Sequence, residues 1–325
     1  MEQLKSEGIT ILGAGCIGCY LAGLFMAESI PVRMIGRQWF ADELSQYGLT
    51  AVNTDGRHQS FSSDIIDFHT EPEALEGSRL ILLCVKHSGL EEAAAQIREY
   101  APQATVISLL NGLNSTESLK RYLQPELVVA GFVAYGVTYL QQGVFKKTSE
   151  GCLHLEAHEA LKPWLPTLDQ ALEKSRLHDD ILAAQWSKLL LNLNNSINAM
   201  SGVPLKEQLK QRRYRKLWAD CMNEGLSVMK KSGLSPVNIG TAIALEKMPF
   251  VLKLPDFLFK IVAARALKID DRARMSMWAD LQRGRETEVD ALNGEVLRYA
   301  HKLGMKAVSN QRVYDEIKRL EKKTQ

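Results

Sequence analysis

Six residues near the start of the chain have the spacing of a phosphate-binding glycine loop. The loop comprises Gly13, Ala14, Gly15, Cys16, Ile17 and Gly18. It lies between an apolar run at 9–12 and an apolar helical stretch at 19–27, and this strand–turn–helix context separates a real fingerprint from a chance match. The first glycine makes a tight turn, the second lets the backbone approach a pyrophosphate, and the third lets helix and strand pack closely. The amino end of the helix then attracts phosphate, so the loop predicts a dinucleotide site.

The residue after the second strand-like run predicts which dinucleotide is bound. That run, at 32–35, ends at Gly36 and Arg37. An NAD site is expected to carry Asp or Glu roughly 20 residues beyond the loop to hold the ribose 2′-hydroxyl. Gly36 has no side chain to do this, whereas the guanidinium of Arg37 can pair with a 2′-phosphate. The sequence therefore favours NADP(H), and the alternative is a solvated arginine at the end of a strand.

Three polar residues interrupt an apolar helical pattern in the second half of the chain. Lys188, Asn192 and Ser196 are spaced four apart, so they drift slowly along one helix face. An ammonium, an amide and a hydroxyl on one line can bind a polar substrate. They can also be structural, and spacing alone leaves both interpretations open.

A second polar cluster follows later in the sequence. Ser276 and Asp280 share a helix face, but Glu288 is too far along to share it on a straight helix. Gly284 allows a break, which would place Glu288 in the first turn of a new helix. The buried stripe of that helix would comprise Val289, Leu292, Val296, Ala300 and Leu303.

Length and composition limit the kind of protein that can position these groups. With 325 residues the chain suits two domains. A content of 46% hydrophobic and 24% charged residues is typical of a soluble globular protein. A net charge of +2 gives no bulk electrostatic support for a nucleic-acid or membrane partner.

No apolar run is long enough to span a bilayer, and residues 1–8 do not resemble a signal peptide. We expect a cytoplasmic protein whose five cysteines are reduced.

The two halves of the chain differ in their periodicity. The first alternates strand-like runs with helical patterns, which is typical of a parallel sheet; the runs lie at 9–12, 32–35, 80–85, 105–109 and 127–132, and a strand-rich stretch spans 133–155. The second is helical at 181–200, 207–231, 236–247, 256–268, 272–283 and 286–303. The pattern predicts an α/β Rossmann-type dinucleotide-binding domain at 1–179, followed by an all-α domain at 180–325. The charged tail at 318–325 is expected to fray.

The loop also contains a pair of cysteines, Cys16 and Cys19, with the spacing of a redox or zinc motif. No second cysteine or histidine pair is near enough in sequence to complete a metal site. We therefore expect no metal, and we assign these two side chains to the first helical turn.

The chain resembles the ketopantoate reductases (2-dehydropantoate 2-reductases) over almost its whole length. Four ordered motifs carry the resemblance in addition to the glycine loop and Arg37: Val85-Lys86, Asn111-Gly112, Lys188-x-x-x-Asn192, and the pair Ser276-Met277-x-x-Asp280 with Thr287-Glu288-x-Asp290-x-x-Asn293-Gly294. The glycine loop alone would not distinguish this family from other dinucleotide-binding proteins, but the four motifs in this order do.

The resemblance implies a reaction and a set of roles. NADPH would deliver hydride to the keto carbon of 2-dehydropantoate, giving pantoate for pantothenate and coenzyme A synthesis, in a cleft between the two domains. Lys188 would be the general acid, and Glu288 would orient Lys188 or hold the substrate hydroxyl. Asn192, Ser196 and Ser276 would contact the substrate, and Lys86 and Asn111 would lie on the cofactor side.

The chain departs from the family pattern in two places. Ser196-Ile197 stands where the family often has asparagine and proline, and Asn195 or Asn198 could compensate for the shorter side chain. The segment 248–269 is longer than in compact members and predicts an extra helical hairpin, either at a homodimer interface or, as an alternative, at a membrane surface. Two other functions stay open: reduction of another 2-oxo acid on the same fold, and a non-catalytic NADP(H)-sensing role.

Overall fold

The structure, a computed structural model, describes residues 8–172, 175–264, 267, 271 and 273–324. The chain forms two compact units. Unit 1 comprises residues 1–110 and 114–181, and unit 2 comprises residues 111–113 and 182–325. The boundary predicted at 179–180 falls within two residues of the division at 181–182. The assignment of the short segment 111–113 to unit 2 was not predicted.

The main sheet of unit 1 has eight strands in the order β12-β11-β8-β7-β6-β1-β2-β5. Their bounds are β1 Ile9–Leu12, β2 Val32–Ile35, β5 Asp67–His69, β6 Leu80–Leu83, β7 Thr105–Ser108, β8 Val128–Val133, β11 Leu153–Glu156 and β12 Arg176–His178. The pairs from β5 to β8 are all parallel, and β11 joins β8 antiparallel. Strand order reverses between β1 and β6, so this is the switch point where open α/β sheets bind ligands at the carboxyl ends of the strands.

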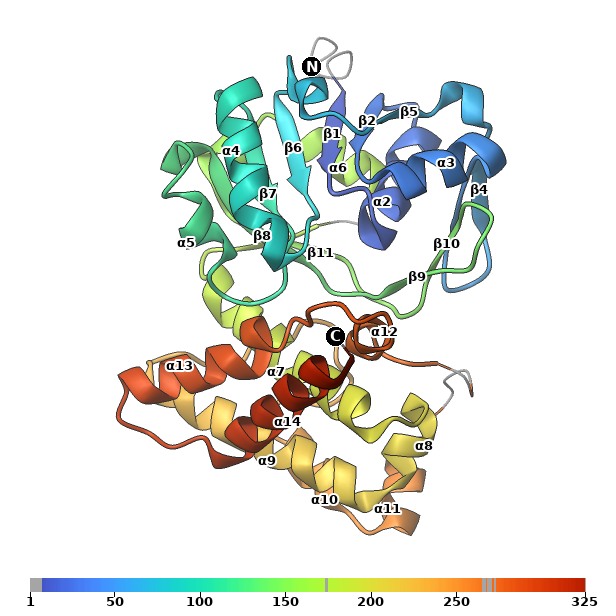
Figure 1. Ribbon diagram of the computed structural model, residues 1–325. Coiled ribbons are helices and arrows are strands. Elements are labelled where there is room, and N and C mark those ends of the chain that lie inside the picture. Colours follow the sequence, from blue (N-terminus) through green and yellow to red (C-terminus); the bar gives the residue numbers. More distant parts are fainter. Residues whose placement is uncertain (1–7, 173–174, 265–266, 268–270, 272, 325) are drawn as a thin grey trace. The chain divides into compact units, whose positions relative to one another are not determined.

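Helices cover both faces of this sheet (Figure 1). Helices α2 (Cys16–Ala27) and α6 (Leu165–Ala171) pack on one face, and α4 (Leu90–Tyr100) and α5 (Ser115–Leu119) pack on the other. The central strands are therefore buried on both sides, which explains their continuous apolar sequences.

A smaller sheet with the order β4-β3-β10-β9 completes unit 1. Its strands are β3 Leu49–Val52, β4 His58–Phe61, β9 Val137–Tyr139 and β10 Val144–Lys147, and helix α3 (Gln38–Tyr47) leads into β3. Gly23 of α2 lies against this sheet, because a Cβ added there would stand 2.7 Å from the Ala51 side chain.

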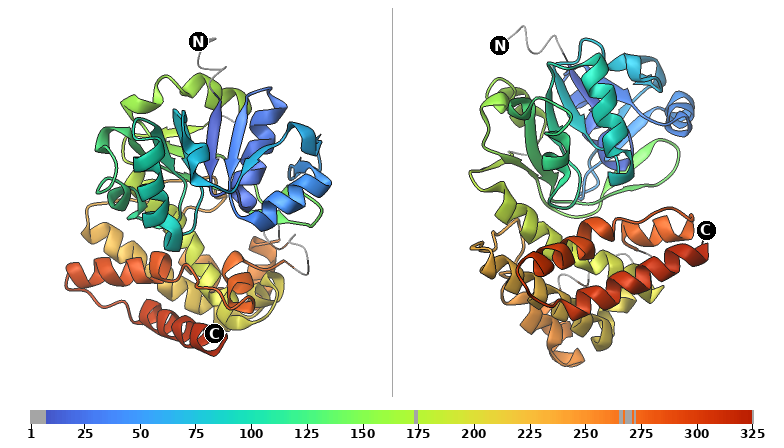
Figure 2. Two further views of the ribbon diagram at one scale, coloured as in Figure 1. Left: turned by 45° about the horizontal axis from the view of Figure 1, so that its top comes forward. Right: turned by 60° about the vertical axis from the view of Figure 1, so that its left-hand side comes forward.

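The described part of unit 2 is helical. Its elements are α7 Ile181–Ser201, α8 Leu205–Lys210, α9 Arg212–Lys231, α10 Met248–Lys253, α11 Asp256–Val262, α12 Ser276–Gln282, the π-helix η6 Asp290–Gly294, α13 Glu295–Lys302 and α14 Val308–Thr324. Helices α10 and α14, the latter dark red, both pack against α9 (Figure 2). The core contains the apolar side of α7, including the fully buried Trp186, Leu190 and Leu193. Among the described helices, none combines the length and the apolar character needed to cross a bilayer.

The fold class is confirmed: an α/β domain with a mainly parallel sheet precedes a helical domain. The helix expected at 236–247 is wrong. In this segment the side chain of Asn238 accepts hydrogen bonds from the backbone amides of Gly240 and Thr241, at 2.8 and 3.0 Å. Such a local turn competes with helix formation.

The end of the chain also differs from expectation. Helix α14 continues to Thr324, so fraying from residue 318 is wrong. Val313 and Ile317 are fully buried, and the Lys318 ammonium lies 2.6 Å from the Asp290 carboxylate, which fixes the charged part of the helix. Arg265 and Lys268 of the extra hairpin lie outside the described residues.

Candidate active site

The glycine loop has the backbone geometry that its spacing predicts. Gly13 follows β1 with a φ of +98°, and a Cβ added there would stand 2.5 Å from the Val85 amide nitrogen at the end of β6. A Cβ at Gly18 would stand 2.8 Å from the Gly13 carbonyl oxygen, because α2 and β1 pack closely there. Both positions therefore require glycine, and the loop sits at the switch point of the sheet.

Gly15 is different, because the space beside it is open. Among the described residues, a Cβ there would meet only the Gly13 carbonyl oxygen, at 4.0 Å. Helix α2 begins immediately after Gly15 and has no side-chain cap, so the first turn presents backbone N–H groups and the positive end of the helix dipole. This combination fits a pyrophosphate.

Arg37 lies beside the same loop. The amides of Gly13 and Ala14 both donate to the Ile35 carbonyl, and a Cβ on Gly36 would stand 3.0 Å from the Ala14 side chain. Arg37 follows directly, is exposed, and precedes α3. Lys86 follows β6 on the other side of the switch point and is half-buried. The cofactor roles of both residues stay predictions.

Unit 2 holds a second polar cluster, which joins residues far apart in sequence. The Asn192 Nδ2 donates to the Asn111 Oδ1 at 3.3 Å, and the Asn111 Nδ2 donates to the Glu288 Oε2 at 2.9 Å. Asn111 thus bridges α7 to the segment after α12. We predicted Asn111 on the cofactor side, and the structure groups it with Asn192 and Glu288. A cofactor contact for Asn111 stays a prediction.

Lys188 lies one turn before Asn192 on α7. Burial lowers the pKa of its ammonium from 10.5 to about 8, and the negative charge of Glu288 opposes part of this shift. A lysine with a pKa near neutral pH can both hold a proton and release it. Lys188, Glu288, Asn111 and Asn192 therefore form a group that can donate a proton and bind a polar ligand.

The local chain geometry explains how Glu288 reaches this group. Helix α12 ends at Gln282, and Gly284 adopts a φ of +60°, which turns the chain. The carbonyl of Glu288 accepts from the Ala291 amide at 3.0 Å, so Glu288 lies at the start of the next helical segment, as its position after Gly284 suggested. That segment opens with the π-helix 290–294, a feature often found at functional sites.

Ser276 is the exposed first residue of α12. The preceding amide, of Met275, donates to the Asn198 Oδ1 at 3.0 Å, which fixes the start of the helix. Substrate binding by Ser276 stays a prediction.

Ser196 belongs to a buried polar network that the sequence did not reveal. Its hydroxyl is fully buried and donates to the Asn293 Oδ1 at 2.6 Å. Asn293 donates in turn to the Asn310 Oδ1 at 2.9 Å, and Asn310 donates to the Glu224 carboxylate at 2.8 Å. The network ties α7 to the π-helix that follows Glu288. We therefore propose a positioning role for Ser196, and its predicted substrate contact has no support in these hydrogen bonds.

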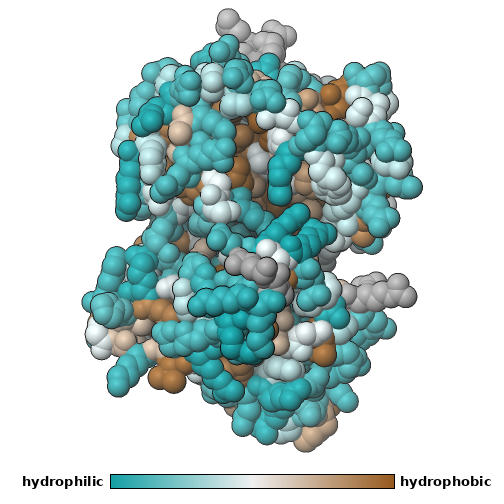
Figure 3. Space-filling view, viewed as in Figure 1, coloured by the Kyte–Doolittle hydropathy of each residue, from teal (hydrophilic) through white to brown (hydrophobic). Residues whose placement is uncertain are grey.

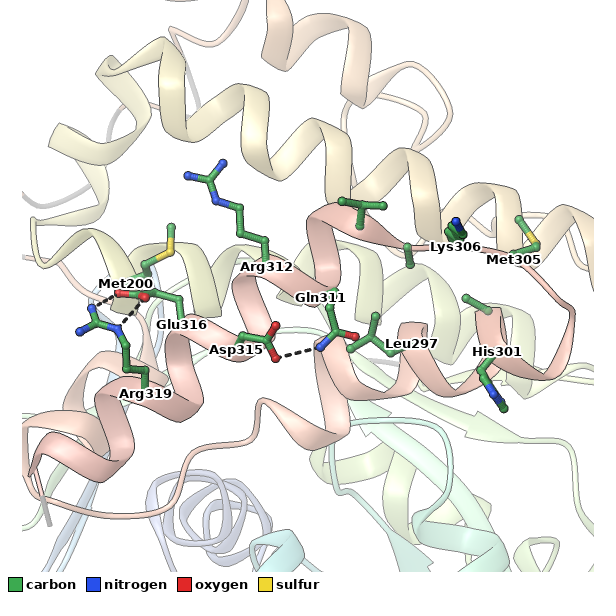
Figure 4. A pocket seen from close by; sticks show the side chains of 13 residues that line it. Met200, Leu297, His301, Met305, Lys306, Gln311, Arg312, Asp315, Glu316 and Arg319 are labelled. Carbon is green, nitrogen blue, oxygen red and sulfur yellow. Dashed lines mark hydrogen bonds and ion pairs between the residues drawn. The ribbon is translucent and has the colours of Figure 1, made fainter.

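A separate groove of about 980 Å³ lies elsewhere on unit 2. Residues of α13, α14 and the end of α7 line it, and its polar groups pair along α14: Gln311 donates to Asp315 at 2.8 Å, and Arg319 pairs with Glu316 (Figure 4). None of its lining residues belongs to the Lys188 group, so we assign no chemistry to it. Within the described residues, no group of three or more His, Cys, Asp or Glu side chains is arranged to hold a metal ion.

Comparison with known proteins gives consistent matches along the chain. The family model described as ketopantoate reductase PanE/ApbA matches residues 9–160, and the model for its C-terminal domain matches residues 180–321. The chain is similar to the 2-dehydropantoate 2-reductase of Pyrococcus abyssi, with 24% identity over 321 residues that cover 95% of this chain and 96% of that protein.

Solved structures share the fold over nearly the same length. A PanE/ApbA family ketopantoate reductase from Ralstonia eutropha JMP134 has a TM-score of 0.81 and 23% identity, covering 98% of this chain and 99% of that one. A D-mandelate dehydrogenase determined with NADH and anilino(oxo)acetate has a TM-score of 0.80 and 19% identity, with the same coverage.

Proposed function

Because the chain belongs to the ketopantoate reductase family, we propose that it reduces 2-dehydropantoate to pantoate with NADPH. The observation that carries this proposal is the group formed by Lys188, Glu288, Asn111 and Asn192, in which a lysine of lowered pKa lies near a carboxylate and two amides. A non-catalytic sensor of NADP(H) has no need for such a lysine.

The residues of unit 1 fit the proposed cofactor. The open space beside Gly15 and the uncapped start of α2 would hold the pyrophosphate, and Arg37 would pair with the 2′-phosphate. When bound, NADPH supplies the hydride that the keto carbon accepts.

The residues of unit 2 would supply the proton that the carbonyl oxygen takes up when the keto group is reduced. The Lys188 Nζ holds this proton and passes it to the carbonyl oxygen as negative charge develops there, and the positive charge also stabilises that oxygen. Glu288 favours the protonated form of Lys188. Asn111 holds the Glu288 carboxylate by its hydrogen bond and keeps it near Lys188.

The test is loss of nicotinamide absorbance with purified protein, NADPH and a panel of 2-oxo acids. We expect rapid oxidation with 2-dehydropantoate and slower oxidation with acids of other shapes. Oxidation of NADPH with another acid alone would mean that this acid, and not 2-dehydropantoate, is the substrate, while the proposed reaction type would stand. Absence of oxidation with every acid, despite tight NADPH binding, would favour the sensor function.

Replacing Arg37 by alanine should lower the preference for NADPH over NADH. The guanidinium is exposed beside the glycine loop, and an Arg–phosphate pair of this kind is charge-assisted. We expect the apparent KM for NADPH to rise about tenfold or more, at a pair strength of about 1.5 kcal/mol, while the KM for NADH changes little. Equal changes for both cofactors would show that Arg37 does not recognise the 2′-phosphate. The exposed Arg57, which pairs with Asp55 in the same unit, provides a control position.

A second candidate substrate is another 2-oxo acid. The support is Ser196: its hydroxyl binds Asn293 instead of lying open to a ligand, so the substrate contacts differ from those that the family motif implies.

We also propose that the chain forms a homodimer through unit 2. Exposed apolar side chains on α10 and α11 support this, since Phe250, Phe257 and Ile261 are 72%, 66% and 72% exposed. Exposed apolar side chains that gather in one region often mark a protein–protein interface. On the face shown in Figure 3, hydrophilic residues predominate and apolar residues form small groups.

A further inference from the structure

A small cavity in unit 1 lies apart from the glycine loop. Its volume is about 220 Å³, below the range of about 300–1,000 Å³ that is typical of pockets for drug-sized ligands. Residues of α2, the end of α6, the small sheet and the start of β11 line it. The described lining residues include neither Arg37 nor Lys86 nor any residue of 13–18. The cavity is therefore a second place in unit 1 where a small ligand can bind.

The lining contains a buried cation beside an aromatic ring. Lys147, the last residue of β10, is 4% exposed, and its Nζ lies 4.5 Å from the centroid of the Tyr135 ring. This cation–π contact stabilises the ammonium in its position. A cation that lines a small cavity in the poorly solvated interior attracts an anion more strongly than the same cation does in water.

Asn53 adds an amide donor to the same lining. Its Oδ1 accepts a hydrogen bond from the Tyr20 hydroxyl, and the Tyr20 and Tyr135 rings meet edge to face at 5.7 Å. Within the part of the chain that the structure describes, the Asn53 Nδ2 donates to no acceptor. An amide nitrogen carries two N–H donors, so this side chain can bind an oxyanion and keep its hydrogen bond with Tyr20.

The described residues that line the cavity include no carboxylate. Two acids near its rim are engaged by other groups: Glu150 accepts from the Thr54 hydroxyl at 2.5 Å, and Asp55 pairs with Arg57 at 2.6 Å. Arg57 also lines the cavity, but its side chain is 81% exposed and Asp55 balances its charge. Among the described lining residues, the buried charge is thus that of Lys147.

We propose that this cavity binds a small oxyanion, such as phosphate or a short dicarboxylate. The Lys147 ammonium supplies a positive charge, which is how lysine binds phosphate, and the Asn53 Nδ2 supplies a directed hydrogen bond. The volume suits an ion of this size and is too small for a dinucleotide. The site is distinct from the one proposed for the pyrophosphate of the cofactor, and it does not depend on the proposed reaction.

The test measures the binding of phosphate and of malonate to the full chain by calorimetry, with sodium chloride at equal ionic strength as the reference. Wild type should bind at least one of the two ions, both with and without NADPH, and the tighter ion identifies the preferred head group. A ligand that binds the folded protein alone raises its stability, so the ion that binds should also raise the Tm of wild type.

Two variants remove the proposed contacts. Lys147→Met keeps the approximate length of the side chain but loses its charge, and it should lower the affinity about tenfold or more. Asn53→Asp keeps the oxygen that accepts from Tyr20 but replaces the amide donor by a second, negatively charged oxygen, so it should lower the affinity by at least as much. Because Asn53→Asp preserves the Tyr20 hydrogen bond, it decides the question if Lys147→Met does not fold.

Arg57→Ala is the matched control, because it removes a positive charge from the exposed rim of the cavity. An exposed charge contributes little in water, so the affinity should change by about threefold or less.

Three outcomes would overturn the inference. Absence of binding by wild type would show that the protein itself balances the charge of Lys147. Loss of binding when NADPH is added would place the oxyanion at the glycine loop. Equal affinity in wild type, Lys147→Met and Asn53→Asp would place the ion elsewhere on the protein.

Discussion

Replacing Lys188 by methionine is expected to abolish reduction while NADPH still binds. General acid catalysis contributes about 10²–10⁴-fold, and loss of a positive charge beside the developing alkoxide costs more, so we expect kcat to fall at least about 10³-fold. Methionine keeps the length and apolar stem of the side chain, and unit 1 holds the residues proposed for the cofactor. The measurements are single-turnover oxidation of NADPH and its binding followed by fluorescence.

Lys206→Met provides the matched control for this change. Lys206 is also a lysine of unit 2, but its ammonium lies 2.5 Å from the Asp271 carboxylate in an ion pair on the surface. Its loss should leave turnover close to that of wild type. Retention of turnover by Lys188→Met would show that the proton comes from another group, and the mechanism proposed for this lysine would be wrong.

The parts of the fold that the sequence predicted are those with strong local patterns. The mainly apolar runs of β1 and β6 to β8 are buried on both faces, so their composition alone marks them as strands. Strand β4 (His58–Phe61) is mostly exposed and polar, and β5 (Asp67–His69) has three residues. These edge strands are too short and too exposed for their sequences to mark them as strands, and pairing with their neighbours defines them instead.

The candidate site was predicted as a set of residues but not as an arrangement. Lys188 and Glu288 are 100 positions apart in sequence, and folding alone brings Asn111 between Asn192 and Glu288. For Ser196 the sequence predicted the wrong arrangement. Its spacing of four from Asn192 suggested that it shares a helix face with Lys188 and Asn192. Each such step rotates the direction by about 40°, and packing against Asn293 fixed its hydroxyl in the interior.

Activity is expected to fall as the pH rises above about 8, because the Lys188 ammonium must be protonated to donate. Burial lowers its pKa from 10.5 to about 8. Below this pH the acid form predominates, and above it the rate should fall about tenfold per pH unit as the proton is lost. A profile of kcat/KM against pH reports the pKa of the free enzyme, and the fall at high pH forms the alkaline limb of this profile. A limb above about pH 10, the range of an unperturbed lysine, would mean that Lys188 is solvated, or that another group donates the proton.

Glu288→Gln should move the alkaline limb of the kcat/KM profile to lower pH. The carboxylate raises the Lys188 pKa against the effect of burial, so its removal leaves burial unopposed and favours the neutral amine. Asp290→Asn is the control, because Asp290 accepts from Tyr314 and pairs with Lys318, and its loss should leave the limb in place. A purely structural role for Glu288 would lower kcat at every pH without moving the limb. A shift in Glu288→Gln alone would therefore show that Glu288 acts on the proton of Lys188.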